Sequence, residues 1–180
     1  MSGQVVDAVT KRPIEGAVVV ATWRMRALEA NVGVIRTLEV TTDGEGRFTV
    51  PGWGPAFWPG PGHVDESQPH LWVYAPQYAP ASFANTCCGA HTPWLLASIE
   101  LPLLKLEPAA AAARESGRQL DELTLSLATF FAKAPCEWRR IPKMLANWER
   151  AWIALRKLGA EPGVEVGSAP SRCKDDTWLN

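Results

Sequence analysis

Two short turn-and-strand segments near the start of the chain restrict its fold more than any other feature. Residues 41–50 read Thr-Thr-Asp-Gly-Glu-Gly-Arg-Phe-Thr-Val, so an Asp-Gly pair and a second glycine precede alternating apolar residues. This pattern is typical of a β-hairpin. Residues 7–21 place Pro13 and Gly16 ahead of a β-branched run, which predicts a tight turn followed by a new strand. The chain therefore begins as a series of short strands.

Together the segments fit the pattern G-x-V-x-D-x-x-T-x-x-P-I-x-G-A-x-V, followed by T-D-x-x-G-x-F-x-V. The matching residues are Gly3, Val5, Asp7, Thr10, Pro13, Gly16, Ala17, Val19, Thr42, Asp43, Gly46, Phe48 and Val50. The pattern resembles that of the carboxypeptidase regulatory-like domain, a small transthyretin-like (prealbumin-like) β-sandwich. Residues 71–78 resemble the strand that ends in Gly-Tyr in this family, with Gln77 in place of the usual glycine.

The resemblance covers residues 3–107 and implies a seven-stranded antiparallel transthyretin-like sandwich. Domains of this family serve mostly as accessory modules, so the resemblance speaks for a fold more than for an activity. Apolar alternation and turn residues predict strands at residues 3–8, 17–25, 35–42, 47–50, 70–75, 81–84 and 98–106. We expect a turn at residues 28–34 and no regular element in the proline- and glycine-rich residues 51–66.

The apolar period changes after Pro108, where helix formers replace β-branched residues. Two helices are predicted, at residues 109–133 and 142–158. Two of the strands are apolar on both faces, because Val18, Val20, Trp72 and Tyr74 point away from the sandwich interior. An amphipathic helical hairpin needs such a surface. The sequence therefore predicts a mainly β fold with an α extension.

This prediction divides the chain into three parts. The sandwich takes residues 1–107, the helical hairpin packed on it takes residues 108–160, and a tail takes residues 161–180.

Charge and hydropathy exclude several classes of partner. Lys and Arg number 18 against 19 Asp and Glu, with no basic stripe, which argues against nucleic acid or an anionic membrane. No apolar run reaches the ~20 residues that a membrane-spanning helix needs. We expect another protein as partner, or self-association through the sheet edges, where an unpaired strand accepts a strand from another chain.

Four cysteines and no C-x-x-C motif favour structural disulfides. We expect two bridges that link the last loop of the sandwich to the hairpin and the tail, with the pairing open among Cys87, Cys88, Cys136 and Cys173. The first strand starts at once after Met1 and leaves no room for a leader. This fits a cytoplasmic protein with free thiols or a mature exported protein that has lost its leader. The cysteines, and the family resemblance, whose members are usually exported, favour a periplasmic, secreted or cell-surface protein, with the cytoplasmic protein as the alternative.

Large aromatic residues of the long loop and beyond it are the binding candidates, namely Trp53, Phe57, Trp58 and Trp94. Exposed aromatic rings pack on sugars and on protein partners. The alternative is that these rings fill the open end of the sandwich.

His63 and Glu66 have the H-x-x-E spacing of a metallocarboxypeptidase zinc site. A catalytic zinc needs three protein ligands, and the third could come only from His70 or His91, which lie too near in sequence for that enzyme fold. We expect no catalytic residues and no cofactor, and keep His63, Glu66 and His70, with Asp65, as candidates for an adventitious metal site. A transthyretin-like purine-pathway hydrolase shares topology only, because its terminal Tyr-Arg-Gly-Ser motif is missing.

These observations predict a non-catalytic, envelope-associated module that binds or scaffolds another macromolecule, or assembles with copies of itself. The first alternative is a carbohydrate-binding accessory domain that uses the aromatic loop. A zinc-dependent hydrolase ranks last.

Overall fold

The computed structural model describes residues 1–28, 30–57, 60–64, 69–84, 98–106, 110–161 and 163. In this part of the chain eight strands precede three helical elements. The strands are β1 (Ser2–Asp7), β2 (Val18–Ala27), β3 (Ala30–Thr41), β4 (Arg47–Thr49), β5 (His63–Val64), β6 (His70–Tyr74), β7 (Ala81–Ala84) and β8 (Ser98–Leu103). The helices are α1 (Ala110–Phe130), the 3-10 helix η1 (Pro135–Arg140) and α2 (Pro142–Lys157).

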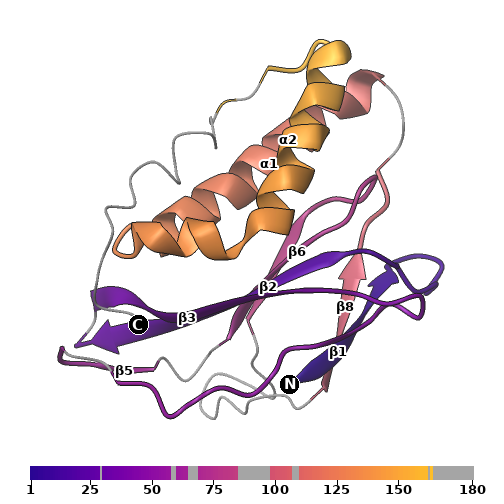
Figure 1. Cartoon of the computed structure of the whole chain (residues 1–180). Coiled ribbons are helices and arrows are strands. Elements are labelled where there is room, and N and C mark those ends of the chain that lie inside the picture. Colours follow the sequence, from indigo (N-terminus) through magenta and orange to yellow (C-terminus); the bar gives the residue numbers. More distant parts are fainter. Residues whose placement is uncertain are drawn as a thin grey trace.

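The strands form two sheets, which are the lower layers of a three-layer arrangement (Figure 1). The small sheet has the order β4-β1-β8, and the large sheet has the order β3-β2-β6-β7, with β5 pairing the far end of β2. A core of apolar side chains joins the facing sides of the two sheets. It consists of Val5, Ile14, Ala17, Val19, Ala21, Phe48, Val50, Leu71, Val73, Ala75, Leu101 and Leu103.

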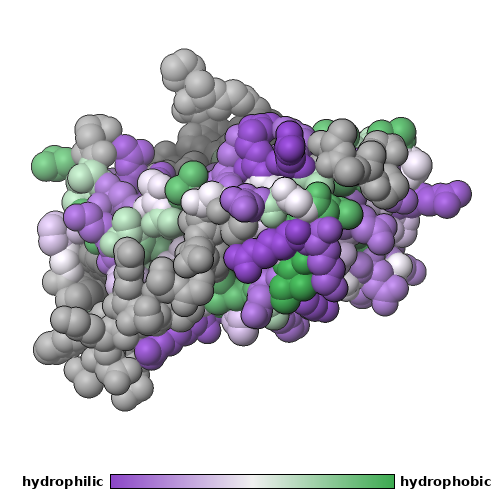
Figure 2. All heavy atoms as spheres, turned by 90° about the horizontal axis from the view of Figure 1, so that it is seen from above, coloured by the Kyte–Doolittle hydropathy of each residue, from purple (hydrophilic) through white to green (hydrophobic). Residues whose placement is uncertain are grey.

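A second core lies between the large sheet and the helices that cover it. The sheet contributes Val18, Val20, Val34, Trp72 and Tyr74, and both α1 and α2 contribute large apolar side chains. The Trp72 ring meets Phe130 of α1 edge-on, with centroids 4.6 Å apart. The outer face of the helical layer is mostly hydrophilic, with scattered apolar side chains (Figure 2). The mainly β fold with an α extension is therefore confirmed.

Three details differ from the sequence-based expectation. β5 is an eighth strand, inside the loop expected to lack regular elements. β1 and β8 pair in parallel, so the strands are not all antiparallel. Such a pair needs a long connection, and the whole chain between the first and last strands supplies it. The predicted turn at residues 28–34 is also wrong, because β2 and β3 remain paired with each other as far as Ala27 and Ala30. Two register shifts interrupt this pairing.

Several motif residues hold the backbone of the sandwich in place. Asp7 accepts hydrogen bonds from the N–H groups of Val9 (2.9 Å) and Thr10 (2.7 Å). The backbone N–H of Thr10 is the main cause of the lowered pKa of Asp7, with burial acting against it. The buried Thr42 hydroxyl donates to the Ile14 carbonyl (2.7 Å) and accepts from the Ala17 N–H (2.9 Å).

Gly46 is required by conformation and by space. Its φ is +68°, and an added Cβ would lie 2.5 Å from the Val5 carbonyl oxygen. The glycine of the Asp-Gly-Glu-Gly turn therefore allows the turn to lie against β1.

A single acid on the sheet sets where α2 begins. The Glu39 carboxylate, on β3, accepts the backbone N–H groups of Lys143 (3.0 Å) and Met144 (2.7 Å) in the first turn of the helix. These N–H groups have no partner inside the helix, and a carboxylate at this end also complements the helix dipole. Within the described residues, no helix is both long and apolar enough to span a bilayer.

We predict that Trp148→Ala lowers the free energy of unfolding by about 3–5 kcal/mol, because the Trp148 side chain is fully buried in the second core. Ile153→Ala, on the 48% exposed Ile153 of the same helix, should cost much less. Urea unfolding monitored by circular dichroism measures both. Equal unfolding midpoints for the two variants would contradict a packed layer beneath α2.

Candidate functional site

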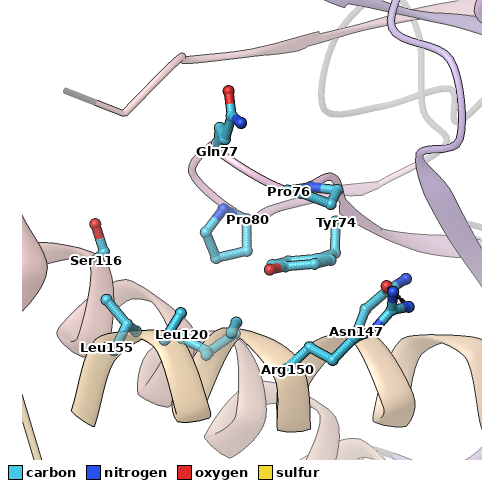
Figure 3. Close-up of a pocket in the computed structure, with 11 residues that line it drawn as sticks. Tyr74, Pro76, Gln77, Pro80, Ser116, Leu120, Asn147, Arg150 and Leu155 are labelled. Carbon is cyan, nitrogen blue, oxygen red and sulfur yellow. Dashed lines mark hydrogen bonds between the residues drawn. The ribbon is translucent and has the colours of Figure 1, made fainter. Parts of the chain in front are cut away.

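A cavity of about 380 Å³ lies where the turn after β6 faces helices α1 and α2 (Figure 3). The sheet side of its lining consists of Tyr74, Pro76, Gln77 and Pro80, and the helical side consists of Ser116, Leu120, Asn147, Arg150, Ala151, Ala154 and Leu155. Its volume falls at the small end of the range for ligand pockets. It is our candidate binding site.

The turn that forms the rim is a tight one. The Tyr78 N–H donates to the Ala75 carbonyl at 3.1 Å, with Pro76 and Gln77 between them. Gln77 has a φ of +69°. A positive φ at the third position, with proline in the second, is typical of a type II turn and explains why glycine is usual there. The Gln77 amide points away from α2 (Figure 3), so this residue lines the cavity without offering its amide to it.

The segment that follows β8 clamps the rim. The Leu106 N–H donates to the Gln77 carbonyl at 2.8 Å, and the Ala79 N–H donates to the Leu104 carbonyl at 2.7 Å. The rim is thus tied on both sides of its tip by backbone hydrogen bonds, which limits how far it can open.

Tyr74 is the most buried polar group of the site. It ends β6, is 7% exposed, and its hydroxyl points toward Pro80 (Figure 3). Burial raises the pKa of the phenol above its ordinary value, and the nearby Arg150 guanidinium acts against this. The group therefore stays protonated at neutral pH and can donate a hydrogen bond. It makes no hydrogen bond to another residue in the described part of the chain.

Arg150 supplies the charge of the site, since no other charged side chain lines the cavity among the described residues. Its guanidinium donates to the Asn147 side-chain oxygen, the dashed line of Figure 3, and to the Ala146 carbonyl at 3.3 Å. Leu120 and Leu155 provide apolar surface opposite the rim. The arrangement can hold an apolar group and a hydrogen-bond acceptor, and its described lining contains no carboxylate or thiol for acid–base or nucleophilic chemistry.

The structure describes two of the four predicted aromatic residues, and these two differ in their packing and exposure. Trp53 packs edge-on against Trp23, with centroids 5.2 Å apart, and Trp23 in turn packs against the inter-sheet core. Phe57 is 84% exposed. Trp58 and Trp94 lie outside the described residues. Trp53 therefore matches the alternative of a ring that closes the sandwich, whereas Phe57 is accessible to a ligand.

The candidate metal ligands are separated in the part of the chain that is described. His63 lies on β5 opposite Arg26, is exposed, and belongs to a strand distinct from that of His70. The His70 ring lies 4.4 Å from the Trp72 ring and 5.5 Å from the Phe130 ring. Asp65 and Glu66 fall outside the described residues. Within the described ranges, no three His, Cys, Asp or Glu side chains gather as a metal site would need.

Cys136, in η1, is disulfide-bonded. Cys87, Cys88 and Cys173 lie outside the described residues, so the pairing of the four cysteines stays open.

No pattern in the sequence indicated the cavity. The apolar alternation of β6 placed Tyr74 only in the contact between sheet and helices, and Arg150 falls on the polar side of the predicted helix. The cavity forms between a turn at residues 75–80 and helical residues that follow much later in the chain, so apolar periodicity could not reveal it. The one available signal was Gln77 at a glycine position, which marks the turn as unusual.

Comparisons with known proteins add little. Neither a protein-family model nor a curated protein matches the chain. Among solved structures, a 9R-lipoxygenase from Cyanothece PCC8801 is similar at 13% identity and a TM-score of 0.26, over 69% of this chain and 22% of that one. A likeness at this TM-score carries no argument about fold or function.

We predict that His70 makes the protein less stable in mild acid. Burial, aided by the Arg24 cation, lowers its pKa from 6.5 to about 4. The unfolded chain therefore takes up a proton at a higher pH than the folded chain does. Stability is then fully present above about pH 6.5 and falls as the pH drops toward 4, by at most about 3.5 kcal/mol.

Urea unfolding at pH 7 and pH 5 tests this prediction. His70→Phe keeps an aromatic ring between Trp72 and Phe130 and should lose less stability than the wild type on acidification. His63→Phe, at an exposed position, is the control. An equal loss of stability between pH 7 and pH 5 in His70→Phe and the wild type would contradict the prediction.

Proposed function

We propose that the protein is a non-catalytic, envelope-associated module that binds another macromolecule through the cavity beside Tyr74. The proposal includes a transthyretin-like sandwich as the scaffold. It is supported by the backbone roles of residues that the family pattern shares, such as Asp7, Thr42 and Gly46, and by the positive φ of Gln77 at a position where glycine is usual.

The observation that carries the binding function is the Tyr74 hydroxyl, which ends a largely buried side chain and has no hydrogen-bond partner among the described residues. The hydroxyl still reaches water, and a ligand that accepts a hydrogen bond from it can replace that water. Here the hydroxyl opens onto a cavity with one cation and an apolar wall. A site of this composition suits recognition of a ligand better than its chemical conversion.

An oxidising compartment agrees with the disulfide at Cys136, since structural disulfides persist mainly outside the cytosol. This supports placing the module in the envelope or outside the cell. Self-association through edge strands is a variant of the same function. β3, with 12 residues, pairs on one side only among the described strands and offers the longest edge.

We predict that Ala154→Trp reduces partner capture about tenfold or more, because the indole would fill the cavity. Ile153→Trp is the matched control, since it adds the same side chain one position away, where the residue does not line the cavity. The measurement is a pull-down from an envelope extract, quantified by mass spectrometry. If both variants capture the same proteins as the wild type, the cavity is not the binding site.

Carbohydrate binding is the second candidate function, and the exposure of Phe57 favours it. An aromatic ring that is 84% exposed is available for packing against a sugar ring. If this function is correct, Phe57→Ala should lower binding on a glycan array several-fold. Leu125→Ala, at an exposed apolar position on α1, should leave binding unchanged. An array that gives no signal with the wild type would remove this candidate.

A further inference from the structure

We infer that the cavity beside Tyr74 takes an apolar group that carries a single carboxylate, an inference that rests on the proposed binding function. The charge of the site gives the first reason. Arg150 is the one charged residue of the described lining, and bonds to Ala146 and Asn147 hold its guanidinium in place. An anion gains from this pre-positioned donor, whereas a cationic ligand is repelled.

The hydroxyl of Tyr74 gives the second reason. It is a protonated donor at the end of a largely buried side chain, with no partner among the described residues, so a ligand that brings an acceptor can bond to it. A carboxylate provides acceptor oxygens together with a negative charge. A neutral amide provides the acceptor without the charge, and an amine provides neither.

The apolar wall gives the third reason and limits the size of the ligand. Leu120, Leu155 and Pro80 face the cavity (Figure 3). Ala151 and Ala154 also line it. Burying an apolar group against them contributes roughly 25 cal/mol per Å² of area removed from water. At about 380 Å³ the cavity suits a body the size of an aryl ring or a branched side chain with its carboxylate.

A phosphate fits the site less well. It carries nearly two charges at neutral pH, and the described lining offers one guanidinium against an apolar wall. Part of the phosphate charge would remain without a partner in surroundings that do not solvate it. One carboxylate matches one guanidinium.

Two sources present this chemistry, a free aryl or acyl carboxylate and the C-terminal residue of a protein chain. Four probes separate them. The first pair is 4-phenylbutyrate and 4-phenylbutyramide, and the second is acetyl-Gly-Gly-Leu with a free or an amidated C-terminus. Binding is measured on the full chain by NMR, from the shifts of the Ala151 and Ala154 backbone amides.

We expect at least one carboxylate to bind about tenfold more tightly than its amide. Tyr74→Phe, which removes only the hydroxyl, should weaken binding of the carboxylate probe about fivefold. Arg150→Gln should reduce the affinity of the carboxylate probe to that of the matching amide. Arg156→Gln removes the same charge from an exposed position of α2 outside the cavity and should have no effect.

Equal binding of carboxylate and amide overturns the inference, as does an equal loss in the Arg150 and Arg156 variants or the absence of any shift with all four probes. The proposed function fails separately. If the probes bind as expected but Ala154→Trp still captures partners normally, the ligand chemistry stands and the macromolecular function does not. If Ala154→Trp blocks capture but the probes show no preference for the carboxylate, the macromolecular function stands and the ligand chemistry does not.

Discussion

The structure depends on covering both faces of the large sheet. β2 and β6 carry apolar side chains on both faces, so one face must meet the small sheet and the other must meet helices. Trp72 shows how much the second cover contributes. Its ring is fully buried, packs edge-on against Phe130, and its indole N–H reaches the Ser126 hydroxyl at 3.4 Å. Without the helices this face would be a large exposed apolar surface, which soluble monomers rarely show.

The position of the helices on the sheet follows from a few directional contacts. Apolar packing alone would allow α2 to slide along the sheet, because burial is not directional. The Glu39 carboxylate removes this freedom, since it bonds the first N–H groups of the helix from a fixed point on β3. Lys143 adds a hydrogen bond from its ammonium group to Thr41 at 2.9 Å. The cavity lies farther along the same helix, where the turn at residues 75–80 keeps the sheet side from closing against α2.

Patterns that are local in the sequence predicted most of the fold. Alternation in β2 and β6 indicated two buried faces, and helical spacing placed α2 to within one residue at its C-terminal end. The parallel pairing of β1 with β8 and the extension of β3 depend on contacts between distant segments, which no local period records. The packing of Trp53 could not be predicted for the same reason. Trp53 looked like a ligand platform by residue type, yet its contact with Trp23 is tertiary.

The backbone bonds around Gln77 bear on how fast a ligand can enter and leave. Leu104 and Leu106, in the stretch that leads out of β8, hold the turn, so the mouth of the cavity is part of a hydrogen-bonded frame. Widening the mouth through the main chain would break that frame. Access then falls to the side chains of the lining, such as the exposed Arg150, which can rotate within nanoseconds once its bonds to Ala146 and Asn147 open. Exchange at this site would be governed by side-chain rotation, and no slow hinge step would limit it.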